Sequence, residues 1–67
     1  MYYTAYYADG SDTYNELPEH FTLSDAHYWA SNDHMDGYNA MHSAPVRYTI
    51  YEDDDSVLYE GPPLQKV

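Results

Sequence analysis

The sequence at residues 46–51 is Val-Arg-Tyr-Thr-Ile-Tyr, and it decides the fold class because it has the clearest strand pattern in the chain. β-Branched and aromatic residues favour strands, and successive side chains of a strand point to opposite faces. The alternation predicts that Val46, Tyr48 and Ile50 face the core and that the residues between them face outward. We therefore expect a sheet with one buried face.

The segments on either side of this strand predict its limits and its partner. Pro45 precedes it, and the acidic run Glu52-Asp53-Asp54-Asp55 follows it as a turn. Residues 56–60 would return as an antiparallel strand. Gly61-Pro62-Pro63 would end that strand, because proline lacks the N–H that a sheet ladder needs. Residues 62–67 are expected to form a loose tail.

The N-terminal part of the chain predicts a second hairpin. Residues 2–7, Tyr-Tyr-Thr-Ala-Tyr-Tyr, suit a strand whose odd-numbered residues share one face. Asp9-Gly10 follows as a strong turn signal. Residues 12–17 are expected to return as a second, weaker strand before a proline stops it.

Between the two hairpins the sequence predicts one helix. Thr22-Leu23-Ser24-Asp25 fits the capping-box pattern, with Asp in place of the usual Glu. The helix would run to about Asp36 and stop at Gly37, and residues 39–44 would form a loop. The stripe expected to pack on a sheet is narrow and consists of Leu23, Ala26 and Ala30. The order strand, strand, helix, strand, strand predicts an α+β fold, with one helix on an antiparallel sheet of three to four strands.

The composition fits one small domain over residues 1–67. Aliphatic residues are scarce, so the ten tyrosines and one tryptophan would have to supply much of the core. The absence of cysteine excludes disulfides and thiolate metal sites and fits a reducing cytoplasm. The sequence contains no signal-peptide pattern and no membrane span. A cytoplasmic protein is therefore predicted.

The charge balance gives the strongest indication of function. Asp and Glu number 12, Lys and Arg number 2, and the net charge is −10. Such a surface repels phosphate, so we expect neither direct nucleic-acid binding nor binding to an anionic membrane. It attracts basic surfaces or cations. Charge also keeps small proteins soluble, but the imbalance here exceeds the magnitude of about 2–8 that solubility needs.

Two groups of acids are candidate sites. The run at residues 52–55 allows three interpretations: an ordinary acidic turn, an anionic tip for a basic partner, or a calcium site. The EF-hand pattern is absent, because the central Gly and the bidentate Glu are missing. On the predicted helix, Asp25, Asp33 and Asp36 would form an acidic ridge beside Trp29. The alternative interpretation of the ridge is a solvated helix face.

The sequence carries no catalytic or metal-binding motif. The histidines at positions 20, 27, 34 and 42 lie seven or eight residues apart, whereas two ligands on one helix need a spacing of about three or four. There is no Gly-rich phosphate loop, no cysteine nucleophile and no serine in a GxSxG context. We therefore expect a protein that is not an enzyme and that uses no cofactor or metal.

In its small size, its lack of cysteine, its excess of acids and its interleaved tyrosines, the chain resembles phage-encoded DNA-mimic inhibitors. Within that class it resembles most the small anti-CRISPR proteins that act on type I surveillance complexes. The residues that carry this resemblance, and that we predict to bind the partner, are Asp25, Asp33, Asp36, Glu52, Asp53, Asp54, Asp55 and Glu60, with the tyrosines Tyr38, Tyr51 and Tyr59.

The resemblance implies stoichiometric inhibition without catalysis. A monomer in the cytoplasm of a bacterial host would occlude the basic surface with which a CRISPR-Cas effector complex grips duplex DNA or recognises a protospacer-adjacent motif. Two alternatives stay open. One is a cation-binding module built on the turn at residues 53–55. The other is a structural or assembly domain of a phage or mobile element, in which the charge serves solubility only.

Overall fold

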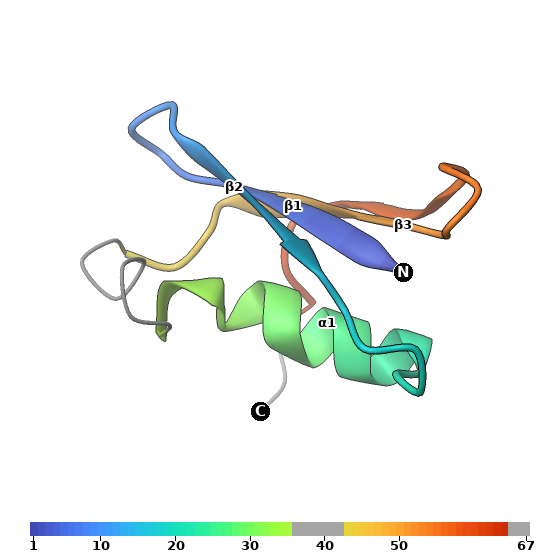
Figure 1. Ribbon diagram of the computed structural model, residues 1–67. Helices are drawn as coiled ribbons and strands as arrows, with labels where there is room; N and C mark the ends of the chain where they lie inside the picture. Colours follow the sequence, from blue (N-terminus) through green and yellow to red (C-terminus); the bar gives the residue numbers. More distant parts are fainter. Residues whose placement is uncertain (36–42, 65–67) are drawn as a thin grey trace.

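The computed structural model describes residues 1–35 and 43–64, and it confirms the predicted α+β class and the order of elements (Figure 1). The elements are β1 (Tyr2–Tyr6), β2 (Asp12–Glu16), α1 (Leu23–Ser31), the 3-10 helix η1 (Asp33–Met35), β3 (Arg47–Tyr51) and β4 (Val57–Gly61). Each predicted strand is found to within one residue at either end. The predicted stop at Gly37, most of the loop at 39–44 and the end of the tail lie outside the described residues.

The four strands form one antiparallel sheet in the order β2-β1-β3-β4. β1 therefore lies between its hairpin partner β2 and the more distant strand β3, where Tyr3 pairs with Ile50 and Ala5 pairs with Tyr48. Figure 1 shows α1 beneath one face of this sheet, and no described element covers the other face. We call the uncovered face the open face.

Tyrosine supplies the bulk of the core between the sheet and α1, as the composition predicts. The buried residues come from β1 and the residue after it, from α1 and from β3: Tyr3, Ala5, Tyr7, Ala26, Ala30, Tyr48 and Ile50. The two alanines let the helix backbone approach the sheet closely enough for the rings to fill the space between them. Each large ring can bury roughly 150–250 Å², which compensates for the lack of aliphatic side chains.

Two expectations about side-chain direction need correction. Val46 is 50% exposed instead of buried, because β3 begins only at Arg47. Leu23, predicted as part of the buried helix stripe, is 41% exposed at the first position of α1. The face predicted to be outward also contains one buried residue, Thr49 in the middle of the sheet. The side chains of β1 and β3 otherwise alternate between the two faces as predicted.

The helix begins as predicted and ends early. Thr22 Oγ1 accepts the Asp25 N–H at 3.2 Å, and Asp25 Oδ2 accepts the Thr22 N–H at 3.0 Å, which completes a capping box. α1 ends at Ser31 and not near Asp36, and the tighter helix η1 follows it. The change from α-helix to 3-10 helix alters the direction of the side chains in η1, from Asp33 to Met35.

Candidate docking surface on the open face of the sheet

The acidic turn, residues 52–55, joins β3 to β4 and exposes all four of its side chains. Two backbone bonds close it: Glu52 N–H donates to Ser56 at 2.8 Å, and Asp55 N–H donates to Glu52 at 2.8 Å. Asp55 adopts a positive φ of 73°, a conformation that Asp tolerates better than most residues. Asp54 accepts the hydroxyl and the N–H of Ser56, and these bonds lower the pKa of the Asp54 carboxyl.

Two carboxylates of the acidic turn are held against the start of β1. The Tyr2 hydroxyl donates to Asp55 Oδ1 at 2.5 Å, and the Met1 ammonium lies 2.7 Å from Asp53 Oδ1. The bond to Asp55 raises the pKa of Tyr2 to about 12, and the bond to Asp53 raises the pKa of the N-terminal amine. These contacts join the N-terminus to the acidic turn and hold the turn against the sheet.

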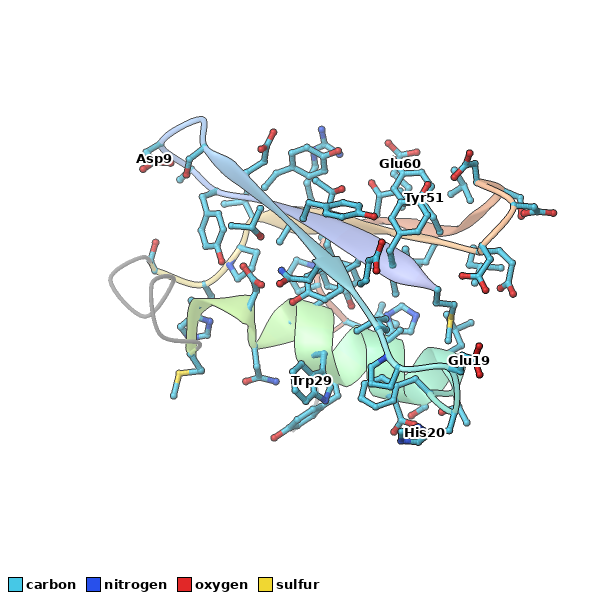
Figure 2. The ribbon with its side chains drawn as sticks, in the orientation of Figure 1. Asp9, Glu19, His20, Trp29, Tyr51 and Glu60 are labelled. Atoms are coloured by element: carbon cyan, nitrogen blue, oxygen red, sulfur yellow. The ribbon has the colours of Figure 1, made fainter. Side chains whose placement is uncertain are left out.

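The cross-strand registers order the side chains of the open face, because directly paired residues project from the same face. Three rows result: Glu16–Tyr2–Tyr51, Tyr14–Thr4–Thr49–Glu60 and Asp12–Tyr6–Arg47. In Figure 2, Tyr51 and Glu60 project from the side of the sheet opposite α1. The face thus carries a strip of tyrosines with carboxylates on both edge strands.

The tyrosines of the open face are in mutual contact. The Tyr2 and Tyr51 rings stack with centroids 4.7 Å apart, and the Tyr14 ring lies 5.4 Å from Tyr2 at a tilted angle. The Tyr14 hydroxyl donates to Glu16 Oε2 at 3.1 Å. Desolvation and this bond raise the pKa of Tyr14. The rings and the carboxylates therefore form one connected surface.

An open groove lies between the end of β2 and the acidic turn. We call it the tyrosine groove, and the residues of its lining that carry rings or charge are Tyr2, Tyr14, Glu16, Glu19, Asp53 and Asp55, with the Met1 ammonium at its edge. Four of these are acids from two distant segments, residues 16–19 and residues 53–55. Sequence reasoning identified Asp53 and Asp55 but missed the other members. A partial signal was present, since a hairpin with Asp9-Gly10 as its turn brings Tyr2 opposite Glu16, but no pattern in the sequence indicates that this hairpin lies beside the acidic turn.

Arg47 is the basic residue of the open face. Its guanidinium carbon lies 4.0 Å from the centroid of the Tyr6 ring, and its Nη1 lies 3.7 Å from Glu60 Oε2. Both ends of the ion pair are exposed to solvent, so it contributes little to folding. It does show how this face holds a guanidinium: against a ring, with a carboxylate beside it.

The predicted partner-binding residues of the second hairpin divide between the two faces. Glu52, Asp53, Asp54, Asp55 and Glu60 are exposed on the acidic turn and β4, and Tyr51 lies on the open face. Tyr59 lies on the opposite face, where its ring packs 4.7 Å from His27 and 5.4 Å from Tyr48. Its hydroxyl donates to the carbonyl of Pro62. Tyr59 therefore supports the core and does not belong to the docking surface.

The predicted acidic ridge on the helix is wrong. Asp25 is exposed, but its carboxylate is used by the capping box. Asp33 is buried, with 1% of its surface exposed, because the chain turns inward after α1 ends. Asp36 and Tyr38 lie outside the described residues. No continuous row of exposed acids follows the described part of α1.

Asp33 holds η1 to the first hairpin through four neutral donors. Its Oδ1 accepts the Tyr3 hydroxyl at 2.7 Å and the Asn15 amide at 3.1 Å. Its Oδ2 accepts the Thr13 hydroxyl at 2.8 Å and the Tyr7 hydroxyl. A buried carboxylate is tolerated when its lone pairs are satisfied in this way. Asp33 is thus a structural residue.

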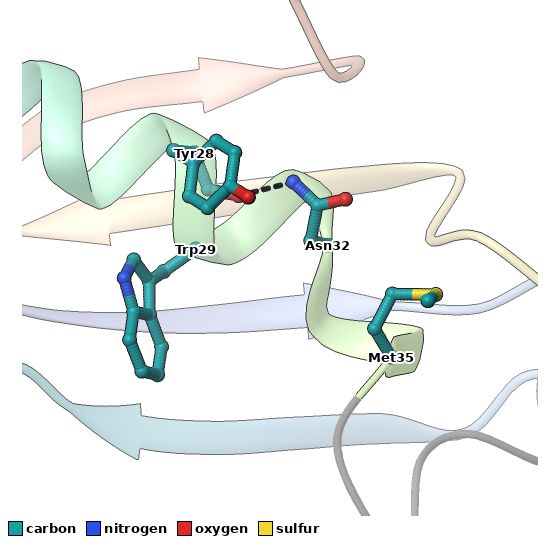
Figure 3. A pocket seen from close by; sticks show the side chains of 4 residues that line it. All are labelled: Tyr28, Trp29, Asn32 and Met35. Atoms are coloured by element: carbon teal, nitrogen blue, oxygen red, sulfur yellow. Dashed lines mark hydrogen bonds between the residues drawn. The ribbon is translucent and has the colours of Figure 1, made fainter.

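The outer side of α1 differs from the open face because its pocket is lined by uncharged residues (Figure 3). A shallow pocket there is lined by the uncharged residues Tyr28, Trp29, Asn32 and Met35. The Asn32 amide donates to the Tyr28 carbonyl at 2.8 Å. In Figure 2, Trp29 lies on the side of α1 away from the sheet. The surface acids of the described chain therefore concentrate on the sheet and its turns, and Asp25 is the acid that α1 contributes.

The described residues contain neither a metal site nor a helix that could span a membrane. Among residues 1–35 and 43–64, no group of three or more His, Asp or Glu side chains is placed to hold a metal ion. The described helices are too short or too polar to cross a membrane. No protein-family model, no curated protein and no solved structure matches this chain.

Proposed function

We propose that this chain is an acidic DNA-mimic inhibitor that binds, with its open face and acidic turn, the DNA-binding groove of a basic protein. The observation that carries the proposal is the fixed, one-sided array of carboxylates. Asp53 and Asp55 are tied to the start of β1, Glu16 is bonded to Tyr14, and Glu60 is paired with Arg47 on the same face.

The spacing of the array supports mimicry of a polynucleotide. Alternate side chains of a strand are about 6.6 Å apart, and neighbouring strands are about 4.8 Å apart. Carboxylates on the two edge strands β2 and β4 are three strand spacings, about 14 Å, apart, a separation close to the roughly 12 Å width of the DNA major groove between its phosphate strands.

The charge of the whole chain supports binding to a basic groove. With a net charge of −10, long-range attraction accelerates association with a positively charged surface. Arg47, the basic side chain on the open face, is already engaged with Tyr6 and Glu60. The partner supplies the remaining positive charge, and the interaction weakens as salt is added.

The target class that we propose is a CRISPR-Cas effector complex of type I, in the cytoplasm of a bacterial host. The chain resembles small anti-CRISPR proteins in size, charge and tyrosine content. It would act stoichiometrically as a monomer, by occluding the surface that grips duplex DNA or recognises the protospacer-adjacent motif. No catalytic step is needed for this activity, and we propose none.

The test is inhibition of DNA binding by a panel of purified type I surveillance complexes, measured by electrophoretic mobility shift. Wild-type protein should prevent binding of target duplex to at least one complex at near-equimolar ratio. The double variant Glu52→Gln/Glu60→Gln should weaken this inhibition about tenfold or more, because charge pairs at such interfaces couple by roughly 1.5 kcal/mol or more.

The matched control is Ser43→Lys/Ala44→Lys, which changes the net charge by the same two units at exposed positions before β3. It should inhibit as the wild type does, apart from a small loss that the change in net charge causes. Equal inhibition by the wild type and the Glu52/Glu60 variant would contradict the assignment of the open face. A lack of inhibition across the panel would leave the structural or assembly role as the better explanation.

A further inference from the structure

The open face already contains a guanidinium in a defined environment. Arg47 lies over the Tyr6 ring at 4.0 Å, with Glu60 3.7 Å from one of its nitrogens. A planar guanidinium stacks on an aromatic ring while its N–H groups remain free to pair with a carboxylate at the ring edge. Tyr6, Arg47 and Glu60 show that side chains of this face can provide both contacts at once.

The other end of the open face also places carboxylates beside tyrosine rings, but no guanidinium of the described residues lies there. Tyr2 and Tyr14 line the tyrosine groove and are in contact, and Tyr51, beside the groove, stacks on Tyr2 and supports its ring. Glu16 and Asp55 lie at the edges of these rings, and the tyrosine hydroxyls bond one oxygen of each, Oε2 and Oδ1. Of the described residues that line the groove, none is Lys or Arg.

The balance of charge in the groove is negative. It is lined by four carboxylates, those of Glu16, Glu19, Asp53 and Asp55. The Met1 ammonium faces Asp53 and compensates one of them. Aromatic walls distinguish this groove from an ordinary cation site, and its carboxylates do not converge as metal ligands do. Charge and ring surface together fit an organic cation that is flat.

We infer that the tyrosine groove is the docking site for an arginine side chain of the partner, which would lie against the exposed Tyr14 ring and the Tyr2 ring and pair with Glu16 or Asp55, as Arg47 lies against Tyr6 and pairs with Glu60. The inference rests on the proposed function and specifies the chemistry of the partner. Lysine fits less well, because its ammonium is a strongly hydrated point charge and has no plane to stack. Arginines that grip phosphates in a DNA-binding surface have the required chemistry.

The test uses two probes of equal length, an arginine oligopeptide and a lysine oligopeptide, titrated into the full chain at the same salt concentration. Binding is measured by calorimetry and by NMR. The arginine peptide should bind about three- to tenfold more tightly than the lysine peptide. This ratio is the gain in affinity expected when a guanidinium stacks on an aromatic ring at a partly exposed site. The aromatic resonances of Tyr2, Tyr14 and Tyr51 should shift more with arginine than with lysine.

Tyrosine variants separate the contribution of ring stacking to peptide binding from the contribution of charge. Tyr14→Leu and Tyr51→Leu should reduce the preference for arginine and leave the lysine affinity unchanged, while Tyr28→Leu, on the outer side of α1, should keep the preference. Circular dichroism establishes that each variant is folded, and Tyr14 is 59% exposed, so its replacement leaves the core intact. Equal affinity for both peptides, or shifts confined to other residues, would overturn the inference.

The result of the peptide titration can be distinguished from the result of the inhibition test. If a surveillance complex is inhibited while the two peptides bind equally, the docking site is wrong and DNA mimicry stands. If the arginine preference depends on Tyr14 and Tyr51 while no DNA-binding complex is inhibited, the groove is an arginine site and the proposed class of target is wrong.

Discussion

At the scale of single residues, the bond between Tyr2 and Asp55 connects the acidic turn to the sheet. Its acceptor belongs to the most acidic run in the chain, and its donor belongs to the stacked tyrosines of the open face. The neutral tyrosine hydroxyl donates to the carboxylate, and a tyrosinate cannot do so. One of the two contacts that hold the turn to the start of β1 therefore depends on the protonation state of Tyr2.

This dependence predicts a titration above neutral pH. The folded state raises the pKa of Tyr2 from 10.0 to about 12, chiefly through the bond to Asp55. A pKa that is raised by folding contributes stability that is complete below pH 10 and is lost as the pH rises through 12. Tyrosinate absorbance should show a late-titrating group that Asp55→Asn shifts toward its ordinary pKa.

The control for this titration is Glu52→Gln, which makes the same change of charge in the same turn. Glu52 is not the acceptor of Tyr2, so the late-titrating group should persist in this variant. An unchanged titration curve for Asp55→Asn would show that the bond does not hold the turn in solution. Tyr14, whose pKa is also raised, should titrate late in both variants.

At the scale of elements, Asp33 joins η1 to the first hairpin. Its four donors are Tyr3, Tyr7, Thr13 and Asn15, so β1, the residue after it and β2 all contact one carboxylate. This contact fixes where the chain goes after α1 ends. It also removes Asp33 from the charged surface.

Replacing Asp33 by Ala should destabilise the protein strongly. It leaves buried donors without an acceptor, and each such group costs about 1–3 kcal/mol. We expect the free energy of unfolding to fall by about 3 kcal/mol or more, a large part of the roughly 3–10 kcal/mol typical of a domain this small. Urea denaturation followed by circular dichroism measures the change.

Asp12→Ala is the matched control for Asp33→Ala. Asp12 carries the same charge in the same hairpin but is exposed on β2. Its loss should change the stability by about 0.5 kcal/mol or less. Similar stabilities for the two variants would show that the Asp33 contacts do not hold the elements together.

The elements themselves could be predicted from the sequence, but their assembly could not. The alternation in residues 46–51 and the capping box at Thr22 are local patterns, and local patterns identify strands and helix starts. The end of α1 has no such signal, because the acceptor that turns the chain inward binds donors from β1 and β2. An aspartate in a polar stretch is indistinguishable by sequence from an exposed one.

The candidate site could also be predicted only in part from the sequence. The acidic turn, Tyr51 and Glu60 follow from the second hairpin alone. The contribution of Tyr2, Glu16 and Glu19 depends on the position of β1 between β2 and β3, which brings the two hairpins together. Since the pairing of β1 with β3 joins strands far apart in sequence, no local pattern indicates it.

At the scale of the whole molecule, the two sides of the protein differ. The sheet and its turns carry most of the described surface acids, and the outer side of α1 carries aromatic and apolar side chains. One side of the described protein is therefore more negative than the other. This one-sidedness is what a decoy for a DNA-binding groove needs, because the groove also contacts its ligand from one direction.

The measurement that tests this claim most directly is competition between target duplex and this protein for one purified surveillance complex. Labelled duplex should be displaced in proportion to the protein added, with complete displacement at saturation, and raising the duplex concentration should reverse it. An apparent inhibition constant that rises linearly with duplex concentration is the predicted result. A ternary complex that holds duplex and protein together with undiminished affinity would contradict mimicry.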